Sequence, residues 1–233
     1  MTTEQLDQNG DDRARLLAQR LGRARAAQTR GARQAPSRPG PQPRSERPAL
    51  SFAQQRLWFL DRLIPGNLAY TMQDTAYRLK GELDPVALER AWQAVEERHE
   101  VLRSRFGNDG DQPHVIVDPA GTIPLERLDL SGAADPEQAA RDHTQTQADQ
   151  PFDLATGPLT RAHLLHLAPQ DHILLITVHH SIFDGWSINV LENDLTHAYH
   201  AALANQPPTW PQLPLHYTDF ASWQRQTLTG PTL

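Results

Sequence analysis

Two adjacent histidines and an aspartate lie close together in the stretch HILLITVHHSIFDGW, residues 172–186. Histidine exchanges a proton near neutral pH, and a carboxylate can hold a cation or cap a helix. His179, His180 and Asp184 could therefore serve proton transfer, charge stabilisation or metal binding. Zinc sites, however, typically place their ligands two to four residues apart on a helix or turn. We therefore expect no metal site here.

The residues around the histidines predict the elements that position them. The run from Ile173 to Val178 favours an extended backbone, and its apolar character is typical of a strand buried on both faces. Side chains alternate along a strand, so the two histidines should face opposite sides. We expect His180, nearer the loop, to carry the chemistry and His179 to be buried and hydrogen-bonded. After the loop, apolar residues at helical spacing predict an amphipathic helix: Ile188, Leu191, Leu195, Ala198 and Ala202.

Asp184 and Gly185 fall at the turn between this strand and this helix. For Asp184 we favour a structural role, because an aspartate at such a turn can cap the helix or anchor an arginine. Gly185 has two interpretations. It could let the backbone approach a substrate and donate its N–H, or it could satisfy a turn that needs an unusual φ.

Composition excludes several classes of protein. The 233 residues include no cysteine, which excludes disulfides, thiolate metal sites and a cysteine nucleophile. No apolar run is long enough to span a membrane, and the N-terminus lacks the apolar stretch of a signal peptide, so we expect a cytoplasmic protein without a membrane partner. Residues 1–48 hold ten arginines against five acidic residues, which leaves the remainder acidic and argues against nucleic-acid binding.

The chain divides into three parts. Within residues 1–30, leucines among alanines and arginines predict a short basic helix that would need a docking partner; a solvated extension is the alternative. Residues 31–49 are rich in proline and arginine and predict a linker. Residues 50–233 predict the folded domain. Its helices and strands are mixed and its strands are expected to be antiparallel neighbours, which indicates the α+β class.

Within the folded domain, turn and capping signals divide the chain into elements. We expect helices over residues 51–63, 84–99 and 136–147, the last of them solvated, and strands over residues 71–79, 123–130, 159–167 and 173–179, with a hairpin around the Asn-Asp-Gly turn at 108–110. The last two strands should form a second hairpin, and its return strand carries the histidines.

The segment HHSIFDGWS, residues 179–187, matches the HHxxxDG signature and resembles the condensation domains of nonribosomal peptide synthetases, which belong with the chloramphenicol acetyltransferase-like acyltransferases. Three further segments match the same family in the same order: SFAQQRLWFL at 51–60, RHEVLRSRF at 98–106 and YTDFASWQR at 217–225. The likeness covers residues 50–225. Trp186 after the DG pair resembles peptide-condensing members.

This resemblance implies a chloramphenicol acetyltransferase-like sandwich, of which residues 50–233 would be the N-terminal lobe of two. In such a domain, the amine of an acceptor attacks the thioester of a donor, and both are carried on phosphopantetheine arms of peptidyl carrier proteins. The implied partners are donor and acceptor carrier proteins and a C-terminal lobe or the rest of a synthetase. No cofactor would be bound by the chain itself.

The resemblance also implies roles for single residues. His180 would act either by transferring a proton from the amine or by positioning and electrostatic stabilisation; a model α-amine titrates at about 7.7–8.0, so no strong base is needed. One arginine of the RHEVLRSRF segment would pair with Asp184 and fix the loop, and we select Arg103. His179, Asp184, Gly185 and Trp186 would support the site.

Three classes of function follow from the sequence. The first is an amide-forming condensation lobe that needs a second lobe. The second is a noncatalytic docking module that binds a carrier protein. The third is an acyltransferase that uses coenzyme A. The motif regions around Ser51 and Tyr217 favour membership of a synthetase over the third class.

Overall fold

A four-stranded mixed sheet is the centre of the fold in this computed structural model, which describes residues 38–110 and 112–228, with the backbone alone at 72–75. The strands are β1 (Thr71–Lys80), β4 (Leu125–Asp129), β5 (Thr160–Ala168) and β6 (Asp171–His179), in the order β1-β6-β5-β4. Strand β6 is antiparallel to both of its neighbours. The strand that carries the histidines is therefore internal, as predicted.

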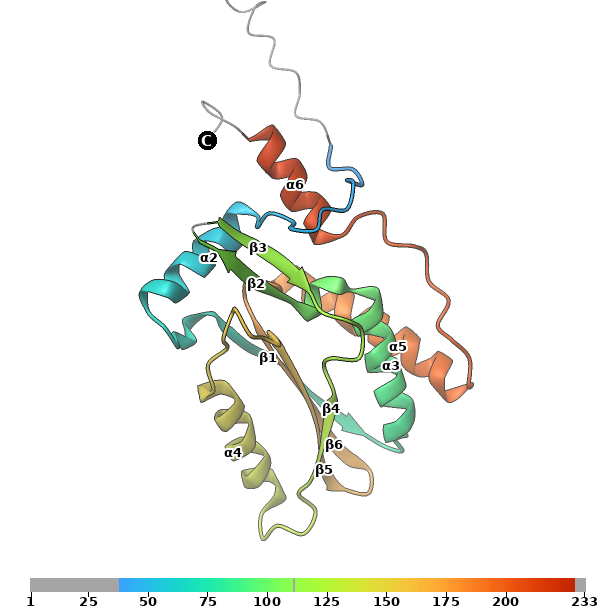
Figure 1. Ribbon diagram of the computed structural model, residues 1–233. Coiled ribbons are helices and arrows are strands. Elements are labelled where there is room, and N and C mark those ends of the chain that lie inside the picture. The colour runs from blue at the N-terminus through green and yellow to red at the C-terminus, as the bar shows by residue number, and fades with distance from the viewer. Residues whose placement is uncertain (1–37, 111, 229–233) are drawn as a thin grey trace, which may run out of the picture. The chain divides into compact units, whose positions relative to one another are not determined.

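Helices cover both faces of this sheet (Figure 1). On one face lie α3 (Pro85–Arg98) and α5 (Gly185–Leu203), whose buried residues join one core with the sheet. On the other face lies α4 (Pro136–Asp149), where Ala140 packs with Leu165 and Leu167. Strand β6 is buried almost throughout because both of its faces are covered.

Local sequence signals set the ends of the helices as predicted. Ser51 caps α2 (Phe52–Leu63), and its hydroxyl accepts the N–H of Gln54 while the Gln54 side chain accepts the N–H of Ser51. Asp84 caps α3, with Pro85 at the first helical position. The predicted solvated helix, α4, is longer than expected and buries one face.

The strand pairing differs from the prediction at one edge. Strands β5 and β6 form the expected hairpin, but β4 is parallel to β5. The two parallel strands are joined through α4, because a parallel connection must cross from one end of the sheet to the other. The predicted hairpin of β2 (Ser104–Asp109) and β3 (Gln112–Val117) is present and forms a separate two-stranded sheet.

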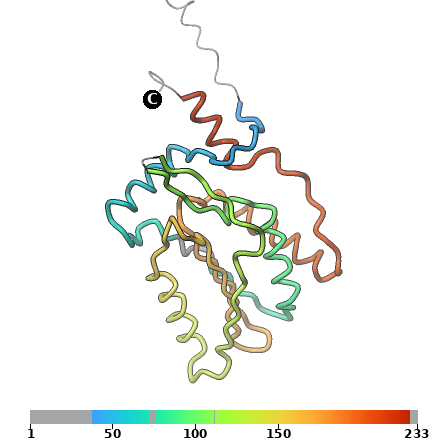
Figure 2. The backbone as a smooth tube through the Cα atoms, in the orientation of Figure 1, coloured from blue at the N-terminus to red at the C-terminus, as the bar shows by residue number. Residues whose placement is uncertain are grey.

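The segment before the helix α2 and the last helix lie against each other. Residues 39–49, which we expected to belong to a linker, contact the domain: the N–H of Gln42 donates to Asp219, and Arg44 pairs with Glu100. Asp219 belongs to α6 (Tyr217–Thr227), and the backbone trace shows the two segments side by side (Figure 2). The predicted N-terminal helix within residues 1–30 lies outside the described residues, as do residues 31–37 and 229–233.

Candidate active site

The histidine loop connects β6 to α5 and spans His180 to Asp184. Strand β6 ends at His179, and Asp184 begins α5 as its capping residue. The carboxylate of Asp184 accepts the N–H of Ser187 at 2.9 Å and its hydroxyl at 2.7 Å. These bonds satisfy donors at the start of the helix and fix where the loop ends. The loop is therefore held by a paired strand on one side and a capped helix on the other.

His179 is buried beneath this loop, with 4% of its surface exposed. Its Nδ1 accepts the N–H of Ser181 at 3.1 Å, so the ring proton of the neutral form lies on Nε2. The rings of Tyr70 and Phe152 contact it edge-on. Burial, and secondarily the nearby His180, lowers the pKa of His179 to about 4. His179 is neutral at physiological pH.

His180 has the opposite arrangement. Its side chain is exposed, and its Nδ1 lies 2.8 Å from the carbonyl oxygen of Phe183. A carbonyl only accepts, so Nδ1 carries the proton and Nε2 of the neutral ring carries a free lone pair. The main chain is also fixed, because the N–H of His180 donates to the carbonyl of Tyr70 at 2.8 Å. The loop thus presents one ring nitrogen that can accept a proton or a hydrogen bond.

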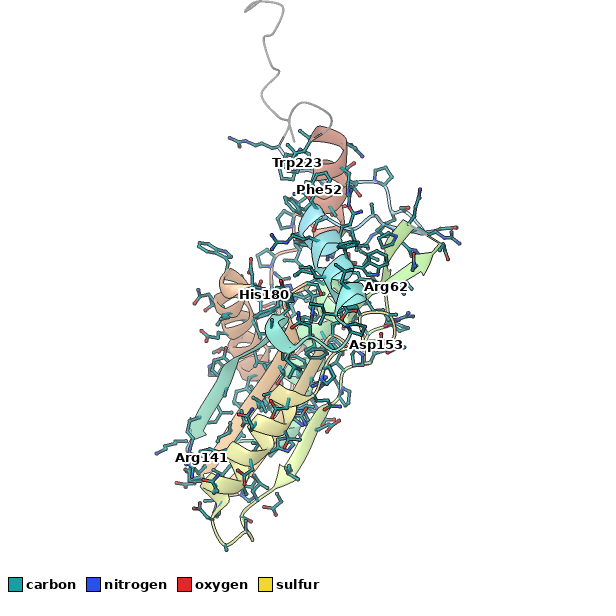
Figure 3. All side chains as sticks on the ribbon, turned by 90° about the vertical axis from the view of Figure 1, so that its left-hand side faces the viewer. Phe52, Arg62, Arg141, Asp153, His180 and Trp223 are labelled. Atoms are coloured by element: carbon teal, nitrogen blue, oxygen red, sulfur yellow. The ribbon has the colours of Figure 1, made fainter. Side chains whose placement is uncertain are left out.

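A cavity of about 390 Å³ lies against His180. Figure 3 shows His180 between the start of α5 and helix α2. The lining residues come from α2, from the loop itself and from segments remote in sequence: Ala53, Arg56, Leu57, Tyr70, Val101, His180, Ser181, Ile182, Phe183, Asp184, Ser187 and Tyr217. The cavity can hold a small polar ligand beside His180.

The prediction that Arg103 pairs with Asp184 is wrong. Arg103 donates to the carbonyl oxygens of Asp118 and Glu96, because it lies where β3 ends beside the 3₁₀ turn η2 (Glu100–Arg103). The arginine of this segment that reaches α5 is Arg98, which pairs with Asp194 at 2.9 Å. The Ser187 hydroxyl, rather than an arginine, is the main reason that the pKa of Asp184 lies below its ordinary value.

Gly185 and Trp186 form the first turn of α5. Gly185 is not among the glycines with positive φ, so the explanation by an unusual φ is wrong. A Cβ at Gly185 would meet no atom within 4 Å, so packing among the described residues does not require a glycine here, and the close approach of a substrate stays a prediction. The Trp186 side chain is 82% exposed and borders a smaller, apolar pocket of about 120 Å³.

Sequence reasoning missed the contribution of Arg56 and Tyr217 to the cavity. Both lie in segments that the family resemblance had marked, SFAQQRLWFL and YTDFASWQR. Their positions in those segments carry no local sign that they face His180, since the approach of α2 and α6 to the loop is long-range. The resemblance could have singled out these segments, but not the side chains.

Several polar side chains line the cavity beside His180, among them Arg56, Asp184 and Tyr217. Within residues 38–110 and 112–228, no three His, Asp or Glu side chains are arranged to hold a metal ion. Over these residues, no helix is both long enough and apolar enough to cross a membrane.

Comparison with known families places the site in context. The family model described as "Condensation domain" matches residues 45–232. The chain belongs to the condensation-domain family. A linear gramicidin synthase from Brevibacillus parabrevis is 44% identical over 195 residues, which is 83% of this chain and 2% of that protein. Phosphinothricin tripeptide synthetase PhsC from Streptomyces viridochromogenes is 43% identical over 181 residues, 77% of this chain and 17% of that protein.

Solved structures give the same fold. The X-domain from teicoplanin biosynthesis matches with a TM-score of 0.75 and 31% identity, over 82% of this chain and 41% of that one. The starter condensation domain of rhizomide synthetase RzmA matches with a TM-score of 0.71 and 26% identity, over 78% of this chain and 44% of that one. The chloramphenicol acetyltransferase-like α+β fold is thus confirmed, and the chain covers only part of such a domain.

Proposed function

We propose that this chain forms one wall of an active site that joins two carrier-protein-bound thioesters through an amide bond. The observation that carries the proposal is the ring of His180, which belongs to a residue that lines the cavity; its Nδ1–H donates to the carbonyl of Phe183, and its Nε2 is left as an acceptor. An amine substrate has N–H groups to donate to such an acceptor.

In the proposed reaction, the acceptor amine attacks the carbonyl carbon of the donor thioester. A C–N bond forms, the C–S bond breaks, and the proton lost by the amine ends on the departing sulfur. His180 Nε2 supports this step in one of two ways. It accepts the amine proton and passes it to the sulfur, or it orients the neutral amine by accepting a hydrogen bond and stabilises the charge that develops.

The proposed partners are donor and acceptor peptidyl carrier proteins, whose phosphopantetheine arms bring both substrates, together with a C-terminal condensation lobe. The chain covers 41–44% of the matched solved chains, which supports a requirement for further protein to close the site. Residues 1–30 are proposed to dock on an upstream synthetase. A cytoplasmic location stays a prediction.

The test is reconstitution. The chain is incubated with loaded donor and acceptor carrier proteins, with and without a C-terminal lobe from one of its relatives, and the dipeptidyl thioester is measured by mass spectrometry. We expect product only when both lobes are present. Product from the chain alone would contradict the need for a second lobe, and absence of product with both lobes would contradict the proposed reaction.

A second candidate is a noncatalytic recruiting module. It is motivated by one of the matched structures, a complex of the X-domain and OxyB from teicoplanin biosynthesis, with a TM-score of 0.76 and 30% identity. Pull-down with carrier proteins and tailoring oxidases separates the two functions. A recruiting module would bind such partners equally well when His180 is replaced by alanine, and would yield no product in the reconstituted assay.

A further inference from the structure

A continuous chain of hydrogen bonds, buried at Gln54 and Ser51, links the histidine loop to Tyr217. Ser181, next to His180, accepts at its carbonyl oxygen from the Gln54 side-chain amide at 3.2 Å. The Gln54 side-chain oxygen accepts the N–H of Ser51 at 3.0 Å. The Ser51 hydroxyl lies 3.1 Å from the Tyr217 hydroxyl. Three segments far apart in sequence are joined at one side of the cavity.

The direction of the last bond follows from counting protons at Ser51. Its hydroxyl has one proton and two lone pairs, and it already accepts the N–H of Gln54 at 3.1 Å. The residue is fully buried, with 0% of its surface exposed, so its own proton needs an acceptor within the protein. Among the described residues, the Tyr217 oxygen is the acceptor within reach. Ser51 therefore donates to Tyr217.

This direction leaves the proton of the Tyr217 hydroxyl available. Tyr217 is 38% exposed and lines the same cavity as His180. A bond accepted from Ser51 also polarises the phenol and strengthens what it donates. Two residues that line the cavity therefore offer an acceptor, Nε2 of His180, and a donor, the Tyr217 hydroxyl, and they come from different parts of the fold.

The phenol is held rigidly enough to act at a defined position. Tyr217 is the first residue of α6, and its ring contacts that of Phe220 with centroids 5.5 Å apart. Further hydrogen bonds tie helix α6 to the start of α2: Arg225 donates to the Leu50 carbonyl at 2.8 Å and to the side chain of Gln55, and Gln224 accepts the N–H of Phe52 at 2.9 Å. Such preorganisation is what lets a donor stabilise developing charge without moving.

We infer that Tyr217 is a substrate-contacting hydrogen-bond donor that binds the carbonyl oxygen of the donor thioester and stabilises the negative charge it gains during attack. Amide formation develops positive charge on the amine and negative charge on this oxygen, so it needs an acceptor for the first and a donor for the second. The inference rests on the proposed function, and it assigns to α6 a part in the chemistry.

The first test compares two variants that break the same Ser–Tyr bond. Tyr217→Phe removes the phenol hydroxyl and keeps the ring, whereas Ser51→Ala keeps the phenol. In the two-lobe assay, corrected for folded fraction, we expect Tyr217→Phe to slow amide formation about 10²-fold, as for other oxyanion donors, and Ser51→Ala to slow it less than about tenfold. Equal losses in the two variants would mean that the bond is only structural and would overturn the inference.

A matched control is Tyr199→Phe. The Tyr199 hydroxyl also takes part in one hydrogen bond, accepting the N–H of Asp84 at 3.0 Å, and Tyr199 does not line the His180 cavity. Its rate should equal that of the wild-type chain. If the wild type forms product and Tyr217→Phe forms it at the same rate, the inference fails while the proposed reaction stands.

The second test needs no catalysis. An aminoacyl thioester of N-acetylcysteamine, labelled with ¹³C at the carbonyl, is added to the full chain, and its ¹³C resonance is followed by NMR. Donation by Tyr217 should move the carbonyl resonance downfield, and the shift should be lost in Tyr217→Phe but retained in Tyr199→Phe. The absence of a shift with the wild-type chain, or its persistence in Tyr217→Phe, would overturn the inference.

Discussion

Strand β6 carries histidines at both ends, and the two ends differ in what surrounds the imidazoles. At its start, His172 stacks on His166 of the neighbouring strand with ring centroids 4.9 Å apart, and His166 lies 3.0 Å from Asp129. At its end, His179 is enclosed while His180 borders an open cavity. The residue type is the same at both ends, so the difference comes from the segments that flank the strand.

The comparison shows what makes a histidine available for chemistry. Nδ1 of His172 is buried and, among the described residues, has no hydrogen-bond partner. Burial also lowers the pKa of His172, so this ring is packed in its neutral form. His180 instead has one nitrogen fixed by a carbonyl and the other beside a cavity. A loop that caps a helix creates this arrangement, whereas a tight hairpin turn, such as the one before His172, does not.

The largest expected effect is on His180. Replacing it with alanine should reduce amide formation in the two-lobe assay by about 10²- to 10⁴-fold, because it removes the acceptor at the cavity. Unfolding by urea should be unchanged within error, since the side chain is exposed. The matched control is His166→Ala at the other end of the sheet, which should keep the full rate. Equal losses in both variants would remove the distinction between the two ends.

The next effect is the pH dependence of stability that His179 imposes. In the unfolded chain, His179 binds a proton below about pH 6.5. In the folded chain, it stays neutral until the pH falls to about 4. Stability should therefore be fully present above pH 6.5 and fall as the pH drops towards 4, by roughly 3 kcal/mol from this residue. Urea denaturation at several pH values measures it.

His179→Gln is the control for this slope, because glutamine does not titrate. The variant should lose less stability between pH 6.5 and 4 than the wild-type chain does, whatever its stability at pH 8. A slope identical to that of the wild type would show that the folded chain binds a proton at His179 as readily as the unfolded chain does, and would contradict the difference drawn between His179 and His180.

A smaller effect is expected at Asp184. Asp184→Ala removes the cap of α5 and should cost about 1 kcal/mol of unfolding free energy, and it should lower soluble yield. Asp135→Ala offers a matched cap, since Asp135 accepts the N–H of Gln138 at the start of α4. We expect similar losses of stability in urea titrations and a fall in amide formation for Asp184→Ala alone. An inactive Asp184→Ala protein with unchanged stability would contradict the capping role.

The smallest effect belongs to the pair of His166 and Asp129. Both side chains are partly exposed, and surface pairs of this kind contribute little to stability because solvent screens them. A double-mutant cycle with His166→Ala and Asp129→Ala should give a coupling energy within the error of the urea titrations. A coupling well outside that error would show that the start of β6 is a built site rather than packed structure.

Much of the fold could be predicted because its signals are local. Ser51 with Gln54, and Asp84 with Pro85, mark the starts of α2 and α3 within four residues, and the structure confirms both. The apolar run before His179 predicted an internal strand, and the structure confirms this too. The parallel pairing of β4 was missed because its partner strand, β5, follows helix α4 in the sequence. A local sequence pattern does not predict which neighbour a strand will pair with.

In the candidate site, too, features set by local sequence could be predicted, whereas features set by long-range contacts could not. The different surroundings expected for His179 and His180 followed from the alternation of side chains along a strand. The partner of Asp184 could not be predicted in this way. Arg98, Arg103 and Arg105 lie on the same short segment, and only the fold decides which of them reaches α5. Tyr217 was missed for the same reason: it meets Ser51 across 166 positions of the chain.

The position of β6 between two antiparallel neighbours has a consequence for hydrogen exchange. Each amide of β6 points to one neighbour, β1 or β5, so exchange along the whole strand requires both ladders to open. The strand that ends at the histidine loop should therefore contain some of the slowest-exchanging amides of the molecule. His180 would then follow directly after the part of the fold that opens least often. Trp186, two residues beyond the loop, is exposed to solvent.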